Sequence, residues 1–299
     1  MNKKSAFVAL AGRPSVGKSS LVNLICGAKV AIVSPVPQTT RNAVRGILTR
    51  PEGQLVFVDT PGRHVSLKKL NSKLMDVADR VLEESELVLY VLDASRAPGP
   101  EEEAVAARLK DRQDRIVAAI NKIDVAGPEK LISFLDEQLP DLKPSRRFEI
   151  SCYKKEGIEP LLACLFEMAE EGEPLYPEEY YTDQEMAFRV SEIIREKAIN
   201  RMREEIPHSI YVDVADLEFR EDSESGKKRL WVRAFIITER ESQKGIIVGK
   251  GGEMIKAIGQ AARKELNSIF DWKVDLDLRV KTGKDWRHND RILKKITGN

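Results

Sequence analysis

Short apolar runs alternate with amphipathic stretches over the first half of the chain. The runs read as strands buried on both faces, and they span residues 7–11, 55–59, 87–93, 116–121 and 148–151. A helix-like stretch follows each run, at residues 18–26, 67–82, 101–112, 128–139 and 157–169. Strands that alternate with helices of this length predict βαβ units. We therefore expect an α/β domain whose mostly parallel sheet has helices on both faces.

One pair of runs has a different spacing. Residues 44–49 and 54–58 are separated only by Arg50-Pro51-Glu52-Gly53. A turn this short joins antiparallel strands, so the sheet should have one antiparallel strand at its edge.

The composition changes abruptly near residue 167. Residues 167–184 carry seven acidic and no basic residues, with two prolines. After this stretch the pattern becomes α-β-β-α-α-β, an order not seen earlier in the chain. We therefore predict a first domain over residues 1–172, an acidic linker over residues 173–184 and an α+β second domain over residues 185–299.

The formal net charge of +1 hides an uneven distribution. The acidic linker offsets two basic domains, and residues 240–299 alone hold 14 basic and 8 acidic residues. Basic residues gathered in one region are what phosphate contacts require. Overall neutrality therefore does not argue against nucleic-acid binding.

Two further features bear on location. No apolar run approaches the roughly 18 residues that a membrane span needs, and the first residues do not resemble a signal peptide. The three cysteines are an odd number without metal-binding spacing. A reducing cytoplasm is therefore the expected compartment.

A phosphate-binding motif follows the first strand. The sequence Gly12-Arg-Pro-Ser-Val-Gly17-Lys18-Ser19 fits G-x-x-x-x-G-K-[ST] between a buried strand and a helix, which is the context that the motif requires. Glycines let backbone amides surround a phosphate at the start of a helix. Lys18 adds a positive charge, and the Ser19 hydroxyl is a magnesium ligand. The predicted contacts are Gly12, Ser15, Val16, Gly17, Lys18, Ser19 and Ser20.

Three other polar motifs end predicted strands, where α/β sheets bind ligands. Asp59-Thr60-Pro61-Gly62 offers a carboxylate for magnesium and the Gly62 N–H for a γ-phosphate. Asn121-Lys122-Ile123-Asp124 places an Asp that can accept both guanine N–H donors, while Lys122 lies over the base. Ser151-Cys152-Tyr153 offers backbone N–H groups to guanine O6. Each tetrapeptide is weak evidence alone, but their order predicts a GTP site.

This set resembles the translation-factor-like GTPases. The resemblance gives a role to Gln38-Thr39-Thr40-Arg41 as switch I, in which Thr40 is favoured over Thr39 as a ligand of magnesium and a contact of the γ-phosphate. It implies hydrolysis of GTP to GDP and phosphate, with Lys18, Thr40 and Gly62 as the catalytic groups. Where Ras-like enzymes have a water-orienting Gln, this chain has Arg63, so slow intrinsic hydrolysis is expected.

A second Gly-rich turn lies in the basic region. Gly249-Lys250-Gly251-Gly252 sits between two predicted helices, where Gly-x-x-Gly lets a nucleic-acid backbone approach closely. With the α-β-β-α-α-β order, it predicts a type II KH domain. The predicted RNA contacts are Ile246, Ile247, Val248, Gly249, Lys250, Gly251, Gly252, Lys256, Lys281, Lys284 and Arg287.

The two halves together resemble the Era family of bacterial ribosome-assembly GTPases over essentially all 299 residues. The resemblance implies binding to small-subunit (16S) ribosomal RNA near its 3′ end and a role in small-subunit assembly. It also implies a cytoplasmic protein with some peripheral association at the inner membrane. Nothing in the sequence suggests an obligate dimer, so a monomer is expected. Three substitutions depart from the family: Ser15 replaces an Asn that in related GTPases helps to hold an activating potassium ion, Arg63 replaces an aliphatic residue, and Cys152 replaces an Ala.

Two alternatives stay open. The chain could be a GTPase switch that controls a membrane- or cell-cycle-linked process, its C-terminal module binding protein or lipid. It could also be an RNA chaperone that holds nucleotide and barely hydrolyses it, since the water-orienting Gln is missing. The Gly-Lys-Gly-Gly turn and the absence of a lipidation motif favour the RNA-binding switch.

Overall fold

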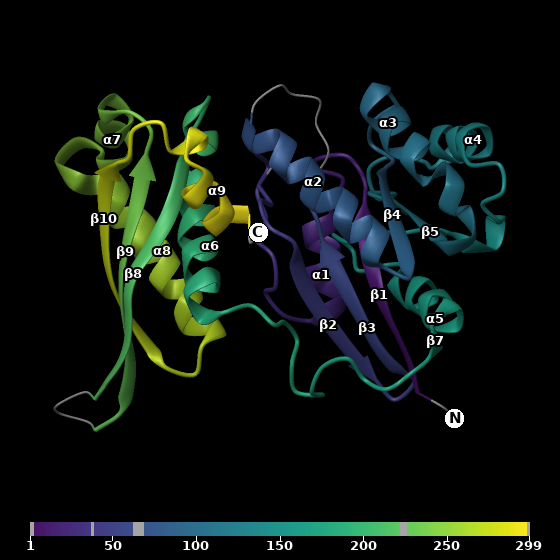
Figure 1. Ribbon diagram of the computed structural model, residues 1–299, viewed down its shortest axis with the longest axis horizontal. Helices are drawn as coiled ribbons and strands as arrows, with labels where there is room; N and C mark the ends of the chain where they lie inside the picture. The colour runs from purple at the N-terminus through teal and green to yellow at the C-terminus, as the bar shows by residue number, and fades with distance from the viewer. Residues whose placement is uncertain (1–2, 37–38, 62–68, 222–225, 298–299) are drawn as a thin grey trace. The chain divides into compact units, whose positions relative to one another are not determined.

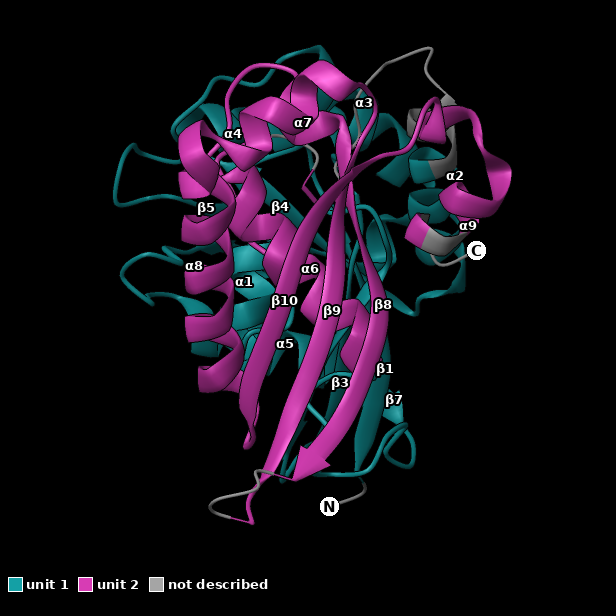
Figure 2. Ribbon diagram, turned by 90° about the vertical axis from the view of Figure 1, so that its left-hand side faces the viewer, with its two compact units in different colours: residues 1–31, 40–183, 297–299 teal, residues 32–39, 184–296 magenta. Residues whose placement is uncertain are grey.

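The computed structural model describes residues 3–36, 39–61, 69–221 and 226–297 (Figure 1). The chain forms two compact units, which Figure 2 colours separately. The first comprises residues 1–31, 40–183 and 297–299, and the second comprises residues 32–39 and 184–296. A short segment from the N-terminal part of the chain therefore belongs to the C-terminal unit.

The first unit is built on a sheet whose described part has seven strands. They are β1 (Lys4–Ala11), β2 (Val44–Arg50), β3 (Gly53–Asp59), β4 (Leu87–Asp93), β5 (Ile116–Asn121), β6 (Arg147–Glu149) and β7 (Glu170–Glu171). The order is β2-β3-β1-β4-β5-β6, with β7 pairing to β1. The β2–β3 and β1–β7 pairs are antiparallel, and the other pairs are parallel.

Helices cover both faces of this sheet. They are α1 (Lys18–Cys26), α2 (Lys69–Glu84), α3 (Pro100–Leu109), α4 (Glu129–Gln138) and α5 (Ile158–Met168), with 3₁₀ turns at Lys110–Arg115 and Pro144–Arg146. The apolar sides of α3 and α4 share a buried cluster with β4 and β5, and α2 packs on the same face. On the other face α1 contacts β2 so closely that a Cβ on Gly46 would lie 2.5 Å from Val22.

The second unit has the order expected of a KH domain. Its elements are α6 (Met186–Ile199), β8 (Ile210–Glu221), β9 (Lys228–Thr238), α7 (Glu241–Val248), α8 (Glu253–Ile269), β10 (Lys273–Thr282) and α9 (Asp290–Thr297), with 3₁₀ turns at Ile206–His208, Lys250–Gly252 and Trp286–His288. The sheet order is β10-β9-β8. Helices α6 and α8 lie against one face (Figure 1) and share an apolar core with it.

The predicted fold class is confirmed: a mostly parallel α/β sheet precedes an α+β unit. The hairpin is also found, since β2 and β3 pair from Val44↔Asp59 to Arg50↔Gly53. None of the helices within the described residues is both long enough and apolar enough to cross a membrane.

The acidic stretch is less free than the sequence indicated. Its residues Glu170–Glu171 form β7, and the residues that follow, up to 183, belong to the first unit. Gln54 holds both the N–H and the carbonyl of Tyr176, at 2.8 and 2.9 Å, and Ile47 donates its N–H to the Tyr181 carbonyl at 2.9 Å. These hydrogen bonds to its backbone hold in place a segment whose composition alone resembles a loose linker.

Candidate nucleotide and RNA sites

The phosphate loop joins β1 to α1, and two of its glycines have no room for a side chain. Gly12 has φ +143°, and a Cβ there would lie 2.4 Å from the Val91 carbonyl oxygen. Gly17 has φ +106°, and its Cβ would lie 2.4 Å from Asn121 Nδ2. The glycine spacing therefore lets the loop pass close to β4 and to Asn121 at the end of β5.

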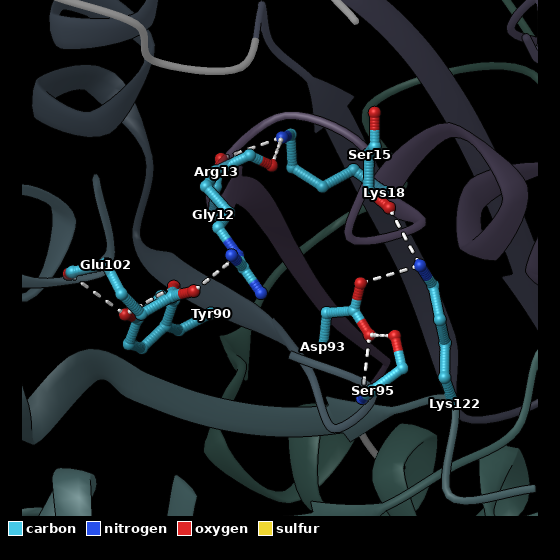
Figure 3. A network of polar contacts seen from close by, with 9 residues as sticks. All are labelled: Gly12, Arg13, Ser15, Lys18, Tyr90, Asp93, Ser95, Glu102 and Lys122. Carbon is cyan, nitrogen blue, oxygen red and sulfur yellow. Dashed lines mark hydrogen bonds and ion pairs between the residues drawn. The ribbon is translucent and has the colours of Figure 1, made fainter. Parts of the chain in front are cut away.

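Lys18 is buried at the start of α1. Its Nζ donates to the carbonyl oxygens of Gly12 and Arg13, at 2.8 and 3.0 Å (Figure 3). Burial lowers the pKa of this amine, while the charges of Asp59 and Glu102 act in the opposite direction. The ammonium is thus held at the turn of the loop, where it can meet a phosphate.

Three oxygen groups converge beside Lys18, from α1, the segment before β2 and the end of β3. Ser19 Oγ donates to Asp59 Oδ2 at 2.6 Å, and Thr40 Oγ1 lies 3.3 Å from Ser19 Oγ and 3.4 Å from Asp59 Oδ2. Asp59 Oδ1 is buried and has no hydrogen-bond partner among the described residues. A hard divalent cation such as Mg²⁺ favours these hydroxyl and carboxylate oxygens. The three residues therefore fit a magnesium site.

The geometry also separates the two threonines of the switch segment. Thr39 Oγ1 donates to the Val36 carbonyl at 2.6 Å, and the Thr39 carbonyl accepts from Arg195 Nη2 at 2.5 Å. Only Thr40 therefore turns its hydroxyl toward Ser19 and Asp59.

Asn121 connects the loops on either side of the expected base. It is buried, and its Nδ2 donates to the Val16 carbonyl at 2.9 Å. Its Oδ1 accepts the Cys152 N–H at 3.1 Å. This N–H was predicted to face guanine O6, but in the structure it supports the loop through Asn121.

Asp124 and Lys122, the other polar groups predicted to meet the base, are each held by hydrogen bonds to neighbouring residues. Ser151 Oγ donates to Asp124 Oδ1 at 2.5 Å, which orients an exposed carboxylate. Lys122 Nζ donates to Asp93 Oδ2 at 2.6 Å and to the Ser15 carbonyl at 3.1 Å (Figure 3). Burial acts to raise the pKa of Asp93, but hydrogen bonds from Lys122 and Ser95 outweigh it and lower that pKa. Asp93 is therefore a charged support for Lys122.

The remaining predicted nucleotide contacts differ in exposure. Val16 is buried, Ser20 is half-buried, and Ser15 and Tyr153 are exposed. Gly62 and Arg63 lie outside the described residues.

The Gly-x-x-Gly turn lies on the surface of the second unit. Gly249, Gly251 and Gly252 have φ values of +73°, +59° and +83°. A Cβ on Gly249 would meet Met254 at 2.7 Å, whereas nothing lies within 4 Å of one on Gly251 or Gly252. The second half of the turn therefore presents open backbone beside the exposed Lys250, as a phosphate backbone requires.

The predicted RNA contacts split into exposed and internal groups. Ile246 is 54% exposed, and Val248 is half-buried. Ile247 is fully buried in the core, so its side chain cannot meet a base, which corrects that part of the prediction. The reason is packing: Ile247 faces the apolar core of the second unit, whereas Ile246 on the same helix points away from that core.

The basic residues after α7 also differ in their surroundings. Lys256 and Lys284 are exposed. Lys281 Nζ lies 3.5 Å from the centre of the Phe235 ring, and Arg287 Nε lies 3.5 Å from Glu239 Oε2. Trp286 is fully buried and donates Nε1–H to the Ser209 carbonyl at 3.0 Å, so the C-terminal basic stretch is fastened to the domain.

Sequence reasoning missed three supporting residues: Arg13, Asp93 and Glu102. Asp93 ends a predicted strand on the same edge as Asn121, so the rule that found Asn121 could have found it. Arg13 and Glu102 form a buried ion pair at 2.8 Å, and no motif relates their positions in the sequence.

Comparison with known proteins agrees with this geometry. A family model described as a 50S ribosome-binding GTPase matches residues 7–122, and a KH-domain model matches residues 205–287. Fold and site thus define a P-loop GTPase joined to a KH domain.

The particular family follows from full-length relatives. GTPase Era of Treponema denticola is 48% identical, covering 98% of this chain and 99% of its own, and GTPase Era of Borreliella afzelii is 44% identical with the same coverage. The chain belongs to the Era family of GTPases.

Two solved structures match from end to end. Aquifex aeolicus Era bound to GDP and AlF₄⁻ has a TM-score of 0.90 at 36% identity, covering 99% of both chains. Era in complex with MgGDPNP and nucleotides 1506–1542 of 16S ribosomal RNA has a TM-score of 0.91 at 35% identity, again covering 99% of both chains.

Proposed function

We propose that this GTPase is a GTP-driven switch that binds small-subunit ribosomal RNA near its 3′ end and acts in assembly of the small ribosomal subunit. The observation that carries the proposal is the exposed Gly249–Gly252 turn beside Lys250, on a chain that also holds a GTPase site. The end-to-end match to an Era structure with 16S RNA nucleotides supports this RNA as the ligand.

At the nucleotide site, the proposed roles follow from position. The loop amides and Lys18 bind the phosphates, and Asp124 reads the guanine N–H groups. Ser19, Thr40 and Asp59 hold Mg²⁺, which neutralises phosphate charge when bound. Gly62 N–H is proposed to contact the γ-phosphate. Catalysis then rests on positioning and charge stabilisation, with water as the attacking group.

At the RNA site, Gly249, Gly251 and Gly252 admit the backbone, and Lys250 and Lys256 neutralise phosphates. Ile246 and Val248 offer apolar surface to unstacked bases, while Ile247 supports α7 from inside. Lys281, Lys284 and Arg287 extend the basic surface.

The proposal is tested by binding of an RNA with the sequence of nucleotides 1506–1542 of 16S rRNA. The double variant Lys250→Asp, Gly251→Asp should weaken binding at least 10-fold and leave GTP hydrolysis within twofold. The charge-matched control Lys264→Asp, Ser268→Asp alters exposed positions further along α8. Equal losses in both variants would show a general charge effect and overturn the proposed RNA site.

We further propose a cytoplasmic monomer with a fraction at the inner membrane. Resemblance to the Era family supports these assignments, and the three free cysteines fit a reducing compartment. Cell fractionation and light scattering of the purified protein test location and oligomeric state.

A further inference from the structure

The second residue of the phosphate loop turns its side chain into the protein. Arg13 is only 8% exposed, and its Nε lies 2.8 Å from Glu102 Oε2 (Figure 3). Arg13 Nε, Arg13 Nη2 and Glu102 Oε2 are buried and make no hydrogen bond among the described residues, so the 2.8 Å contact is an ion pair. The position of this guanidinium therefore depends on the charge of Glu102.

Glu102 lies in the first turn of α3 and is fully buried. Tyr90 on β4, also fully buried, donates its hydroxyl to Glu102 Oε1 at 2.9 Å. Each carboxylate oxygen thus has one polar neighbour. Burial raises the pKa of Glu102, while the Tyr90 hydrogen bond and the Arg13 charge oppose that rise. The carboxylate depends on both partners to stay ionised.

Arg13, whose side chain contacts Glu102, also accepts a hydrogen bond from Lys18 through its backbone carbonyl. The Arg13 carbonyl accepts from Lys18 Nζ at 3.0 Å, and the adjacent Gly12 carbonyl accepts at 2.8 Å. Gly12 is pressed against β4, as its close approach to Val91 shows. A shift of Arg13 would therefore move both acceptors of the amine that meets the phosphates.

Stability alone is a poor reason for such a pair. Desolvation of two buried charges commonly cancels their attraction, and apolar replacements are often as stable. The pair does, however, hold the loop against α3, and Glu102 is itself held to β4 by the Tyr90 hydrogen bond. Its effect should therefore appear in the geometry of the loop.

We propose that Arg13, Glu102 and Tyr90 form a positioning network that holds the phosphate loop and Lys18 in the conformation that binds the phosphates of guanine nucleotides. None of the three contacts the nucleotide in this scheme. The inference rests on the phosphate site proposed above.

The test is a double-mutant cycle read by the dissociation constants for GDP and GTP. Glu102→Gln and Arg13→Gln should each weaken nucleotide binding at least 10-fold. The double variant should lose little more than Arg13→Gln, because Glu102 acts through Arg13. Tyr90→Phe removes one hydroxyl without changing the shape of the ring and should weaken nucleotide binding two- to fivefold. This variant still tests the network if an Arg13 variant does not fold. Additive losses would overturn the network.

Two comparisons separate positioning from other roles. Arg108→Gln breaks an ion pair with Asp79 made by the same helix and should leave affinity within twofold. If the Arg13 and Glu102 variants lower the unfolding temperature but bind nucleotide within twofold of the parent, the pair is merely structural and the inference fails. Lys18→Ala tests the phosphate site itself: unchanged GTP affinity there would refute that site, whatever the Arg13 result.

Discussion

Replacing Asn121 by Ala should both destabilise the first unit and weaken nucleotide binding. Asn121 is buried and makes two hydrogen bonds, Nδ2 to the Val16 carbonyl at 2.9 Å and Oδ1 from the Cys152 N–H at 3.1 Å. Val16 belongs to the phosphate loop, and Cys152 follows Ser151 at the proposed base site. One side chain thus fixes the distance between the two loops.

The magnitude follows from the groups left behind. A buried donor or acceptor that loses its partner costs about 1–3 kcal/mol. Asn121→Ala leaves one of each, of which the Val16 carbonyl belongs to a residue that is 1% exposed. Cys152 is only half-buried, so its freed N–H keeps part of its hydration and costs about 1 kcal/mol, and we expect a total loss of about 2–4 kcal/mol in the free energy of unfolding. For a unit of this size that corresponds to a fall of roughly 4–16 °C in the unfolding temperature.

Thermal unfolding and GDP titration measure the two effects separately. The matched control is Gln54→Ala, which removes a buried amide that makes hydrogen bonds to Thr49 and Tyr176. Gln54 lies at the amino end of β3, on the opposite edge of the sheet from Asn121. The control should lose comparable stability and keep its GDP affinity within twofold, whereas Asn121→Ala should lose at least 10-fold in affinity. Equal GDP affinity in both variants would refute the bridging role of Asn121.

Four further predictions concern the nucleotide site, the thiols and the second core. Asp124→Asn should shift the binding preference from GTP to XTP, because an amide can donate to the extra carbonyl of xanthine. Competition between the two nucleotides measures the preference, and an unchanged preference for GTP would contradict the role of Asp124. Ser19→Ala should lose most of the gain in GTP affinity that Mg²⁺ gives over EDTA, because a ligand oxygen is removed; an undiminished gain excludes Ser19 as a ligand. Burial raises the pKa of Cys26 and Cys152 to about 12, so both thiols stay protonated at pH 8 and should be alkylated slowly by iodoacetamide until the protein unfolds; rapid labelling of folded protein, seen by mass spectrometry, would argue otherwise. Trp286→Ala should lower the free energy of unfolding of the second unit by about 3–5 kcal/mol, because it empties a fully buried site; chemical denaturation measures this loss. A loss below about 1 kcal/mol would mean that the indole does not fasten the C-terminal basic stretch to the domain.

The parts of the site that were predictable from sequence are those set by local rules. The phosphate loop and the hairpin each follow from spacing within a short window, and the α-β-β-α-α-β order follows from a succession of such local patterns. The meeting of Ser19 with Asp59 follows from a topological rule, since the carboxyl ends of parallel strands share one edge.

What could not be predicted depends on packing across the fold. The Arg13–Glu102 pair joins residues on different elements that no sequence pattern relates. The assignment of Ile247 to the RNA surface failed because the apolar composition of a short helix does not reveal which of its side chains faces the core. The preference for Thr40 over Thr39 comes from the family resemblance alone, and the physical difference between the two hydroxyls appears only in their hydrogen bonds.

The second unit is not continuous in sequence, and this affects the stage of folding at which its core can form. Ile32 lies in its core, and Glu196 on α6 accepts the Val33 N–H at 2.8 Å across a separation of 163 residues. Contacts between residues so far apart close a very long chain loop, and the entropy of closing it slows their formation. A fragment that starts at residue 184 would leave the buried Glu196 without this N–H. The second unit therefore completes its packing only after residues 32–39, which lead into switch I, have packed against it.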